Sequence, residues 1–159
     1  MLARLDAIDR KILSELQEDG RITNVELARR VGISAPPCLR RVRALEEAGY
    51  IKGYRALLDE KKLDCEVTVF AMVHLSSQAE SDLTEFEAFV RQAPLVRECW
   101  MLSGEIDFIL KCVAPNLNAF QAFVAELTGA PHVRNVKTSL TLRVSKDAPI
   151  VPSEVLRVP

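Results

Sequence analysis

Residues 23–49, TNVELARRVGISAPPCLRRVRALEEAG, determine the predicted fold of the first third of this chain. Thr23 and Glu26 have the spacing of a capping box, in which each side chain satisfies a backbone donor at the helix start, and Gly32 ends that helix. Ser34 is a favourable N-cap for a second helix, whose first turn tolerates two prolines because N–H groups there have no partner. Two capped helices joined by a short turn that contains glycine predict a helix-turn-helix.

The segments on either side of this pair complete a small domain. Upstream, apolar residues at helical spacing lie between Asp6, a candidate N-cap, and Gly20, a candidate stop, and predict a further helix. Downstream, YIKGYRALLD (residues 50–59) alternates in polarity around Gly53. This pattern predicts either a strand–turn–strand wing or a linker into a second domain.

Positive charge is concentrated in residues 29–55. This stretch holds seven Lys or Arg and two Glu, a net charge of +5, whereas the whole chain carries -1. A focused patch of this kind is typical of a surface that contacts phosphates. A solvated helix face is the alternative, which charge alone does not exclude.

The second helix of the pair is predicted to separate its charges from its apolar side chains. At 100° per residue, Arg40 points away from the apolar side, and Arg41 and Arg43 lie on its two shoulders. This is the layout of a DNA recognition helix, since the planar donors of arginine bind a guanine edge or a phosphate. The residues expected on the buried side are Leu39, Val42 and Leu45. The candidate DNA-contacting residues are Asn24, Ser34, Pro37, Arg40, Arg41, Arg43, Lys52 and Arg55.

The sequence after residue 60 has a different rhythm, in which β-branched stretches alternate with apolar residues at helical spacing. The predicted order is strand, helix, strand, strand, helix, strand, over residues 65–75, 81–94, 96–103, 106–114, 116–131 and 133–145. This βαββαβ order predicts a four-stranded antiparallel sheet with two helices on one face, the ferredoxin-like arrangement, and an α+β fold class. Several positions on the other face are apolar, so we expect a partner subunit to cover it.

A chain of 159 residues suits one ordinary domain or two small ones. The patterns divide it into a helix-turn-helix domain at 1–60, a sheet domain at 61–146 and a tail at 147–159. The tail contains three prolines and predicts either a loose terminus or a strap over a neighbouring subunit.

Composition and spacing argue against several classes of protein. With 48% hydrophobic and 27% charged residues, the chain can bury a core. Its first residues carry scattered charges and no long apolar run, which argues against a signal peptide or a membrane span. The four cysteines and two histidines are spaced too widely for a zinc site, and no catalytic constellation is visible. We therefore expect reduced thiols in a cytoplasmic protein that has no metal, no cofactor and no enzymatic activity.

Three stretches resemble the Lrp/AsnC family of transcription regulators: LDAIDRKILSELQEDGRITNVELARRVGIS (5–34), PPCLRRVRALEEAGYIKGYRALLD (36–59) and ECWMLSGEIDFILK (98–111). The resemblance covers nearly the full length and is closest to the leucine-responsive branch. It implies a winged helix-turn-helix followed by an αβ sandwich, the regulation of amino-acid metabolism (RAM) domain. It also implies double-stranded DNA as a partner, homodimers that assemble further to octamers, and a place on the bacterial nucleoid. An amino-acid effector, such as leucine, is expected at interfaces between dimers.

The hairpin LSGEID (residues 102–107) offers the groups that a buried amino acid requires. Asp107 or Glu105 can pair with the ammonium group, and backbone N–H groups around Ser103 and Gly104 can donate to the carboxylate. A turn glycine and a solvated aspartate are the alternative. The family resemblance, whose signature has Gly three residues before Asp, favours an effector site. The candidate wall residues on the last strand are Ser139, Leu140 and Thr141.

Two other classes of function share these features. An architectural DNA-binding protein without an effector would use the same arginines, and the ferredoxin-like fold also hosts small-molecule enzymes. We expect a sequence-specific, homo-oligomeric DNA-binding regulator that responds to an amino acid. Binding of amino acids separates it from the architectural protein, and the absence of turnover separates it from the enzyme.

Overall fold

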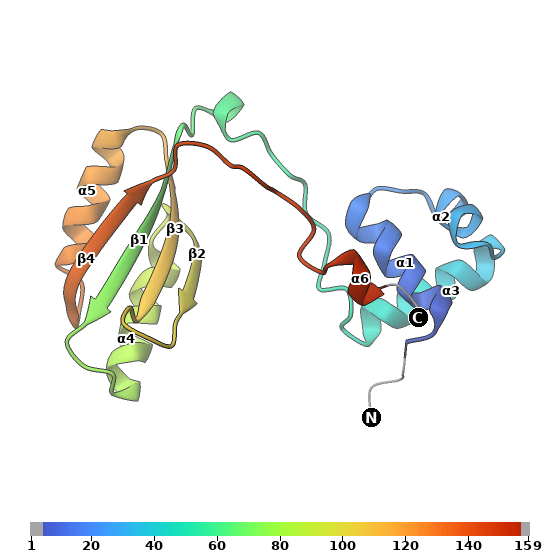
Figure 1. Cartoon of the computed structure of the whole chain (residues 1–159), viewed down its shortest axis with the longest axis horizontal. Coiled ribbons are helices and arrows are strands. Elements are labelled where there is room, and N and C mark those ends of the chain that lie inside the picture. Colours follow the sequence, from blue (N-terminus) through green and yellow to red (C-terminus); the bar gives the residue numbers. More distant parts are fainter. Residues whose placement is uncertain (1–4, 157–159) are drawn as a thin grey trace. The chain divides into compact units, whose positions relative to one another are not determined.

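The computed structural model describes residues 5–156 of the chain, which form two compact units (Figure 1). One unit joins the chain up to Leu57 with the segment from Lys146 onward, and the other is Leu58–Ser145. The second unit is the predicted sheet domain, whereas the tail belongs with the helical unit. No helix in the described residues is both long and apolar enough to cross a membrane.

Three helices build the first unit: α1 (Ala7–Glu18), α2 (Asn24–Val31) and α3 (Ala35–Glu47). The predicted helix-turn-helix is therefore confirmed. Gly32 ends α2 in the left-handed region at φ +84°, which glycine adopts at no steric cost and which turns the chain sharply into α3.

The three helices begin at the predicted N-cap residues, Asp6, Thr23 and Ser34, but two of the caps differ from the prediction in their hydrogen bonds. Asp6 begins α1 with a reciprocal capping box to Asp9. Thr23 Oγ1 accepts a hydrogen bond from the Glu26 backbone N–H at 3.3 Å. The second bond of the predicted capping box, from the Thr23 backbone N–H to the Glu26 carboxylate, is not formed, because Arg29 and Arg30 engage that carboxylate. Ser34 occupies the N-cap of α3, yet its side chain makes no capping hydrogen bond.

The buried stripe of α3 is rotated from the predicted one. Cys38 and Leu45 are buried, Val42 is half-buried, and Leu39 is 39% exposed, so the prediction that Leu39 faces the core is wrong. Cys38, Val42 and Leu45 span an arc of about 60° at 100° per residue, whereas the predicted stripe spans about 120°. The fully or nearly buried residues of this core are Ile12, Leu27, Ala28, Val31, Cys38 and Leu45.

Residues 51–59 form no strand, so the wing hairpin is not formed in this chain and the segment is the linker that the sequence also allowed. A short 3₁₀ turn, Lys61–Leu63, follows it. The linker side chains are mostly exposed, and Gly53 has φ +149°. Basic residues on this segment therefore face solvent.

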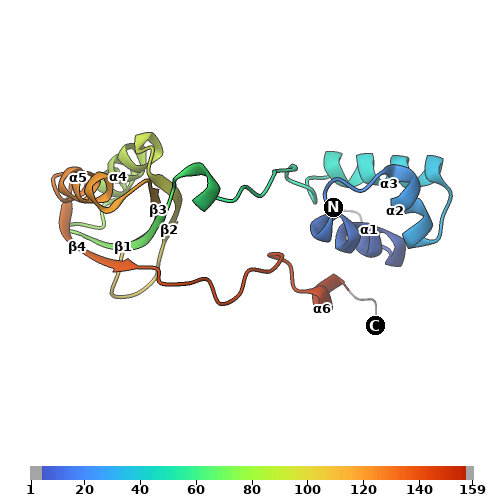
Figure 2. The same cartoon turned by 90° about the horizontal axis from the view of Figure 1, so that it is seen from above.

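The second unit has the predicted βαββαβ order and a four-stranded antiparallel sheet in the order β2-β3-β1-β4. Both helices cover one face of this sheet (Figure 2). Phe86 and Phe108 form the centre of the core, with ring centroids 4.8 Å apart. The elements are β1 (Val67–Leu75), α4 (Glu80–Gln92), β2 (Val96–Met101), β3 (Phe108–Ala114), α5 (Leu117–Thr128) and β4 (Val133–Leu140).

The other face of the sheet carries a row of apolar side chains that run across three strands. Trp100, Ile109 and Met72 are register partners on β2, β3 and β1, and Phe70 lies two residues from Met72 on the same side. Trp100 is 43% exposed, and the other three are half-buried. This face lacks the helical cover of the opposite one.

The C-terminal tail is not loose, because it packs against the helical unit of its own chain. The C-terminal strap (residues 146–156), which ends in the short helix α6 (Ser153–Leu156), packs against α1 of its own helical unit. Gln17 Nε2 donates to the Val151 carbonyl at 3.0 Å, and Arg10 Nη1 donates to the Val155 carbonyl at 2.9 Å. The strap and α1 enclose a largely apolar cavity of about 440 Å³.

Candidate nucleic-acid interface and amino-acid site

The start of α2 holds the start of α3 in place. Asn24 Nδ2 donates to the Ala35 carbonyl at 2.8 Å in a partly buried hydrogen bond. The amide of Asn24 is therefore engaged within the helix-turn-helix, where it fixes the entry of α3. Its Oδ1 is buried and has no hydrogen-bond partner in the described part of the chain.

Local carboxylates engage three of the seven bases in residues 29–55. Arg29 and Arg30 pair with Glu26 at 2.6 and 2.9 Å, and Arg30 also reaches Glu15 at 3.0 Å. Hydrogen bonds from Arg29 and then Arg30 lower the pKa of Glu26 to about 2. Glu26 therefore stays ionised at neutral pH and cancels one of the two positive charges of α2.

Arg41 is the third engaged base. The sequence predicts that it contacts DNA, whereas in the structure its guanidinium pairs with carboxylates of α1. Its Nη1 lies 2.6 Å from Asp9 and 2.7 Å from Asp6, both on α1, and its side chain is 34% exposed. The Asp9 N–H and the Arg41 guanidinium together lower the pKa of Asp6, and the two carboxylates raise the pKa of Arg41. Arg41 sits only about 60° from Cys38 on the helix, so it faces α1 rather than solvent. It ties α3 to α1.

The other four of the seven bases in residues 29–55 have no carboxylate partner in the described part of the chain. They are Arg40, Arg43, Lys52 and Arg55. All four are exposed. Arg40 and Arg43 lie opposite the buried stripe of α3, at the outer face of the helix-turn-helix. Ser34 is also exposed and Pro37 half-buried, at the start of that helix. The positive charge of the sequence patch is thus concentrated on one outward face.

In the second unit, Asp107 is buried and hydrogen-bonded through both carboxylate oxygens. It is 8% exposed, and its two carboxylate oxygens accept hydrogen bonds from the Leu75 N–H and from Gln78 Nε2, each at 2.7 Å. Its backbone N–H donates to the Val73 carbonyl. Asp107 fixes the β2–β3 hairpin to the end of β1, so the alternative of a solvated strand residue is wrong. Each carboxylate oxygen accepts one of the two hydrogen bonds that it can take, and the role of Asp107 as a partner of an ammonium group stays a prediction.

The hairpin itself is exposed at Ser103, Gly104 and Glu105. Gly104 has φ +143°, which L side chains rarely adopt, although a Cβ there would meet no atom within 4 Å. Backbone conformation, rather than close packing, therefore requires this glycine. The exposed loop leaves its backbone groups accessible to a ligand.

The structure does not bring the candidate wall residues to this hairpin. Ser139 pairs with Phe70 on one side of β1, whereas the hairpin leaves β3 on the other side, beside Val73. Thr141 lines a different cavity of about 390 Å³, near Thr68, and its buried Oγ1 has no hydrogen-bond partner in the described residues. Leu140, with Ser139, is exposed at the end of β4. Within one chain, the hairpin residues 103–105 and the candidate wall residues 139–141 therefore lie apart.

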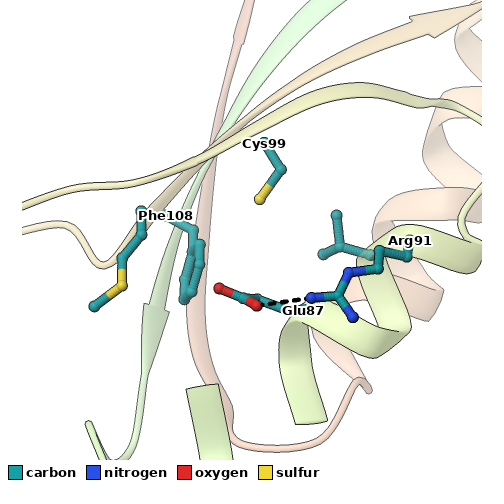
Figure 3. A pocket seen from close by; sticks show the side chains of 6 residues that line it. Glu87, Arg91, Cys99 and Phe108 are labelled. Atoms are coloured by element: carbon teal, nitrogen blue, oxygen red, sulfur yellow. Dashed lines mark hydrogen bonds and ion pairs between the residues drawn. The ribbon is translucent and has the colours of Figure 1, made fainter. Parts of the chain in front are cut away.

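Sequence reasoning missed a cleft between α4 and β2, called here the α4–β2 cleft (Figure 3). Its volume is about 220 Å³. Glu87 and Arg91 form an ion pair at 3.0 Å at its mouth. Burial and then the charge of Glu87 raise the pKa of the Cys99 thiol to about 11, so the thiol is neutral. An i,i+4 acid–base pair on a helix is too common for its sequence spacing to have indicated a pocket. The lining residues are Glu87, Val90, Arg91, Cys99, Met101 and Phe108.

Other chemistry is not indicated. Residues 5–156 contain no group of three or more His, Cys, Asp or Glu side chains placed to hold a metal ion. The four cysteines form no disulfide, and Cys38, inside the helical core, is buried as expected for a packing residue. Two features of the described residues therefore remain as candidate binding sites: the basic outer face of α3, and the β2–β3 hairpin of the sheet unit with the small clefts near it.

Family models match both units of the chain. Residues 5–52 match a winged helix-turn-helix DNA-binding model, and residues 68–151 match the Lrp/AsnC ligand binding domain. The leucine-responsive regulatory protein of Rhizobium meliloti is 62% identical over 145 residues, which cover 91% of this chain and 93% of that protein.

Solved structures match over nearly the whole chain. The transcriptional regulator NMB0573 from Neisseria meningitidis, solved as a complex with L-Met, has a TM-score of 0.90 at 38% identity and covers 96% of this chain and 99% of its own. An AsnC family transcriptional regulator from Agrobacterium tumefaciens has a TM-score of 0.88 at 34% identity, with 95% and 99% covered.

Replacement of Arg41 by Ala tests its role as a tie between helices. We expect Arg41→Ala to lower the free energy of unfolding by about 1 kcal/mol at low salt, since the two ion pairs are partly exposed and screened. Because Asp6 has a lowered pKa, its contribution is present above its ordinary value of 3.8 and is lost as pH falls through the folded-state value. Urea denaturation at pH 7 and pH 2.5 measures this. Arg40→Ala is the control, and equal stability of both variants at pH 7 would contradict the assignment.

Asp107→Ala tests the buried hairpin anchor. The substitution leaves the Leu75 N–H and the Gln78 amide without their acceptor, so we expect a loss of about 1–3 kcal/mol in the free energy of unfolding of the sheet unit. Urea denaturation followed by Trp100 fluorescence reports on this unit. Glu105→Ala, at an exposed position of the same hairpin, should change stability by less than about 0.5 kcal/mol. A stable Asp107→Ala variant would show that the carboxylate does not anchor the hairpin.

Proposed function

This chain belongs to the Lrp/AsnC family of DNA-binding transcription regulators that carry an amino-acid-binding domain, and from that premise we propose how it binds DNA, pairs with a second copy and recognises its effector. One observation carries the DNA part of the proposal. Carboxylates engage Arg29, Arg30 and Arg41, whereas Arg40 and Arg43 on the outer face of α3 have no such partner in the described residues. A charge that the protein leaves uncompensated on one face is available to phosphates and bases.

In the proposed complex α3 lies in the major groove. Arg40 and Arg43 reach base edges or phosphates. The start of the helix, at the exposed Ser34 and the half-buried Pro37, lies near the DNA backbone, where the helix dipole favours phosphate. Lys52 and Arg55, on the linker, contact flanking phosphates. Asn24 and Arg41 act indirectly, through the position of α3. A DNA partner also implies that the protein works in the cytoplasm, on the nucleoid.

We propose that two copies pair through the open face of the sheet. The row of Trp100, Ile109 and Met72, with Phe70 beside it, is the apolar area that a symmetric partner would bury. Pairing presents two copies of α3 to two half-sites on the duplex. Further assembly of dimers, to an octamer, would bend DNA along its surface.

The proposed effector is an amino acid with an apolar side chain. The Neisseria neighbour is a complex with L-Met, and the curated relatives are named for leucine. The exposed hairpin at Ser103–Glu105 offers backbone N–H groups to a carboxylate, and Ser139, Leu140 and Thr141 could complete such a site only from another copy. The effector acts by binding one arrangement of the DNA-binding units more tightly than another.

Arg40→Ala should weaken binding to a target site selected from random DNA by about 1–3 kcal/mol and reduce the preference for that site over random DNA. The loss arises because a guanidinium that reads a base edge contributes mainly to specific binding. Fluorescence anisotropy with labelled duplexes measures both affinities. Arg29→Ala, at a base already paired with Glu26, is the control. Equal losses on target and random DNA for Arg40→Ala would exclude base recognition by this residue.

Met72→Glu should convert the dimer to a monomer. A carboxylate in the apolar row would be buried without a partner, which costs far more than the interface gains at that position. Sedimentation velocity measures the oligomeric state. Leu117→Glu, at a 53% exposed position on α5, is the matched control and should leave the dimer intact. A dimeric Met72→Glu variant would move the interface elsewhere.

A further inference from the structure

We propose that the cavity between α1 and the C-terminal strap, called here the strap cavity, binds a medium-chain aliphatic monocarboxylate such as octanoate, with Lys52 as the partner of its carboxylate. The cavity belongs wholly to the helical unit. Its volume of about 440 Å³ lies within the range of roughly 300–1,000 Å³ that small-molecule sites have. The site is therefore separate from the hairpin of the sheet unit and takes a different class of ligand.

The walls of the strap cavity are apolar and come from three segments: α1, the residues that follow α3, and the strap. The four wall residues from the first two segments also pack against the buried core of the helical unit, so this side of the cavity is well supported. An alkyl chain that enters the cavity loses contact with water along these walls, which favours binding. The apolar wall residues are Leu13, Leu16, Tyr50, Ile51, Val151 and Leu156.

Hydrogen bonds to its backbone hold the strap over the cavity. The Val151 carbonyl accepts from Gln17 Nε2 at 3.0 Å, and the Val155 carbonyl accepts from Arg10 Nη1 at 2.9 Å. Because the strap is attached through carbonyl groups, these two bonds make no demand on its side chains. A bound alkyl chain would therefore add contacts between the strap and α1 without breaking either bond.

The charge of the lining selects an anionic head group. Lys52 is the one charged side chain that lines the strap cavity in the described part of the chain, and no carboxylate pairs with it there. It is exposed, and its flexible stem can lie along an apolar wall while the ammonium group reaches the mouth of the cavity. A carboxylate at the mouth would gain an ion pair, whereas the ammonium group of an amine or a free amino acid would be repelled by Lys52.

Tyr54 adds a neutral aromatic wall beside Lys52. Its hydroxyl donates to Glu46 at 2.9 Å, and burial and then Glu46 raise the pKa of Tyr54 to about 12. The phenol is therefore uncharged at neutral pH and does not compete with a ligand for Lys52. The lining thus offers one positive charge at the edge of an apolar space, which is the complement of an alkyl carboxylate.

Occupancy of the strap cavity and DNA binding would compete for Lys52. The proposed complex assigns this lysine to a flanking phosphate, and a bound carboxylate would neutralise it. This consequence rests on the proposed function, whereas the cavity, its apolar walls and its single charge do not. Calorimetry without DNA therefore separates failure of the carboxylate site from failure of the proposed DNA contacts.

Titration calorimetry on the full chain with hexanoate, octanoate and decanoate tests the walls and the charge. Affinity should rise about fourfold for each added methylene until the cavity is filled. Lys52→Gln should weaken octanoate by about three- to fivefold, the upper range for a partly exposed ion pair, and leave the uncharged 1-octanol within twofold. Lys11→Gln is the matched control, because Lys11 is an exposed lysine of α1 outside the lining, and it should bind both ligands like the wild type.

A pair of strap variants tests the location of the site. Val151→Trp fills the cavity from the strap and should weaken octanoate and 1-octanol at least tenfold while circular dichroism shows a folded protein. Val155→Trp, at a 57% exposed position of the same strap outside the lining, should bind both within twofold of the wild type. Octanoate affinity within twofold of the wild type in both Lys52→Gln and Val151→Trp would overturn the inference, as would a wild type that binds none of the three carboxylates. Neither result bears on the amino-acid response, which is measured with L-leucine.

Discussion

The pairing of basic side chains with nearby carboxylates determines which positive charges of the helical unit are available to another molecule. Glu26 and Glu15 hold the arginines of α2, and Asp6 and Asp9 hold Arg41. The buried core holds α1, α2 and α3 together, and these ion pairs determine which cations remain for another molecule. A net charge of -1 for the whole chain and a basic outer face are compatible, because Arg40 and Arg43 have no carboxylate partner in the described residues while the acids lie elsewhere in the chain. DNA affinity depends on where charge is left uncompensated rather than on total charge.

The sheet unit follows from a different constraint, the coverage of a sheet by helices on one face only. Strands β1 and β3 alternate between the core and the open face, and both lie inside the sheet with neighbours on each side. Such strands need apolar side chains on the core side, and here they have them on the open side as well, at Phe70, Met72 and Ile109. Side chains of this kind on a face without helical cover favour burial against a second copy of the same surface.

Sequence patterns predicted the helices and strands and their order, but not the partners that charged side chains find in distant parts of the chain. Capping residues, glycine stops and hydrophobic periodicity are local, so α2, α3 and the βαββαβ order could be predicted from them. The place of Arg41 could not, because it depends on Asp6 and Asp9 more than thirty residues away. The same holds for Asp107, whose partners Leu75 and Gln78 are about thirty residues upstream. A charged residue in a motif can thus be a binding group or a structural anchor, and only its three-dimensional neighbours decide between the two.

Asp107 and Arg41 each connect elements that are distant in the sequence but lie within one unit. Asp107 connects the hairpin to β1 and to the residue that precedes α4, so the loop cannot move independently of the elements beneath it. Past β4, the chain returns to the helical unit, where the C-terminal strap is bonded to Gln17 and Arg10 of α1. Since Arg41 holds α3 to the start of that same α1, the strap is one contact away from the recognition helix. The strap and Arg41 thus act on the same helix, α1, against which α3 presents Arg40 and Arg43.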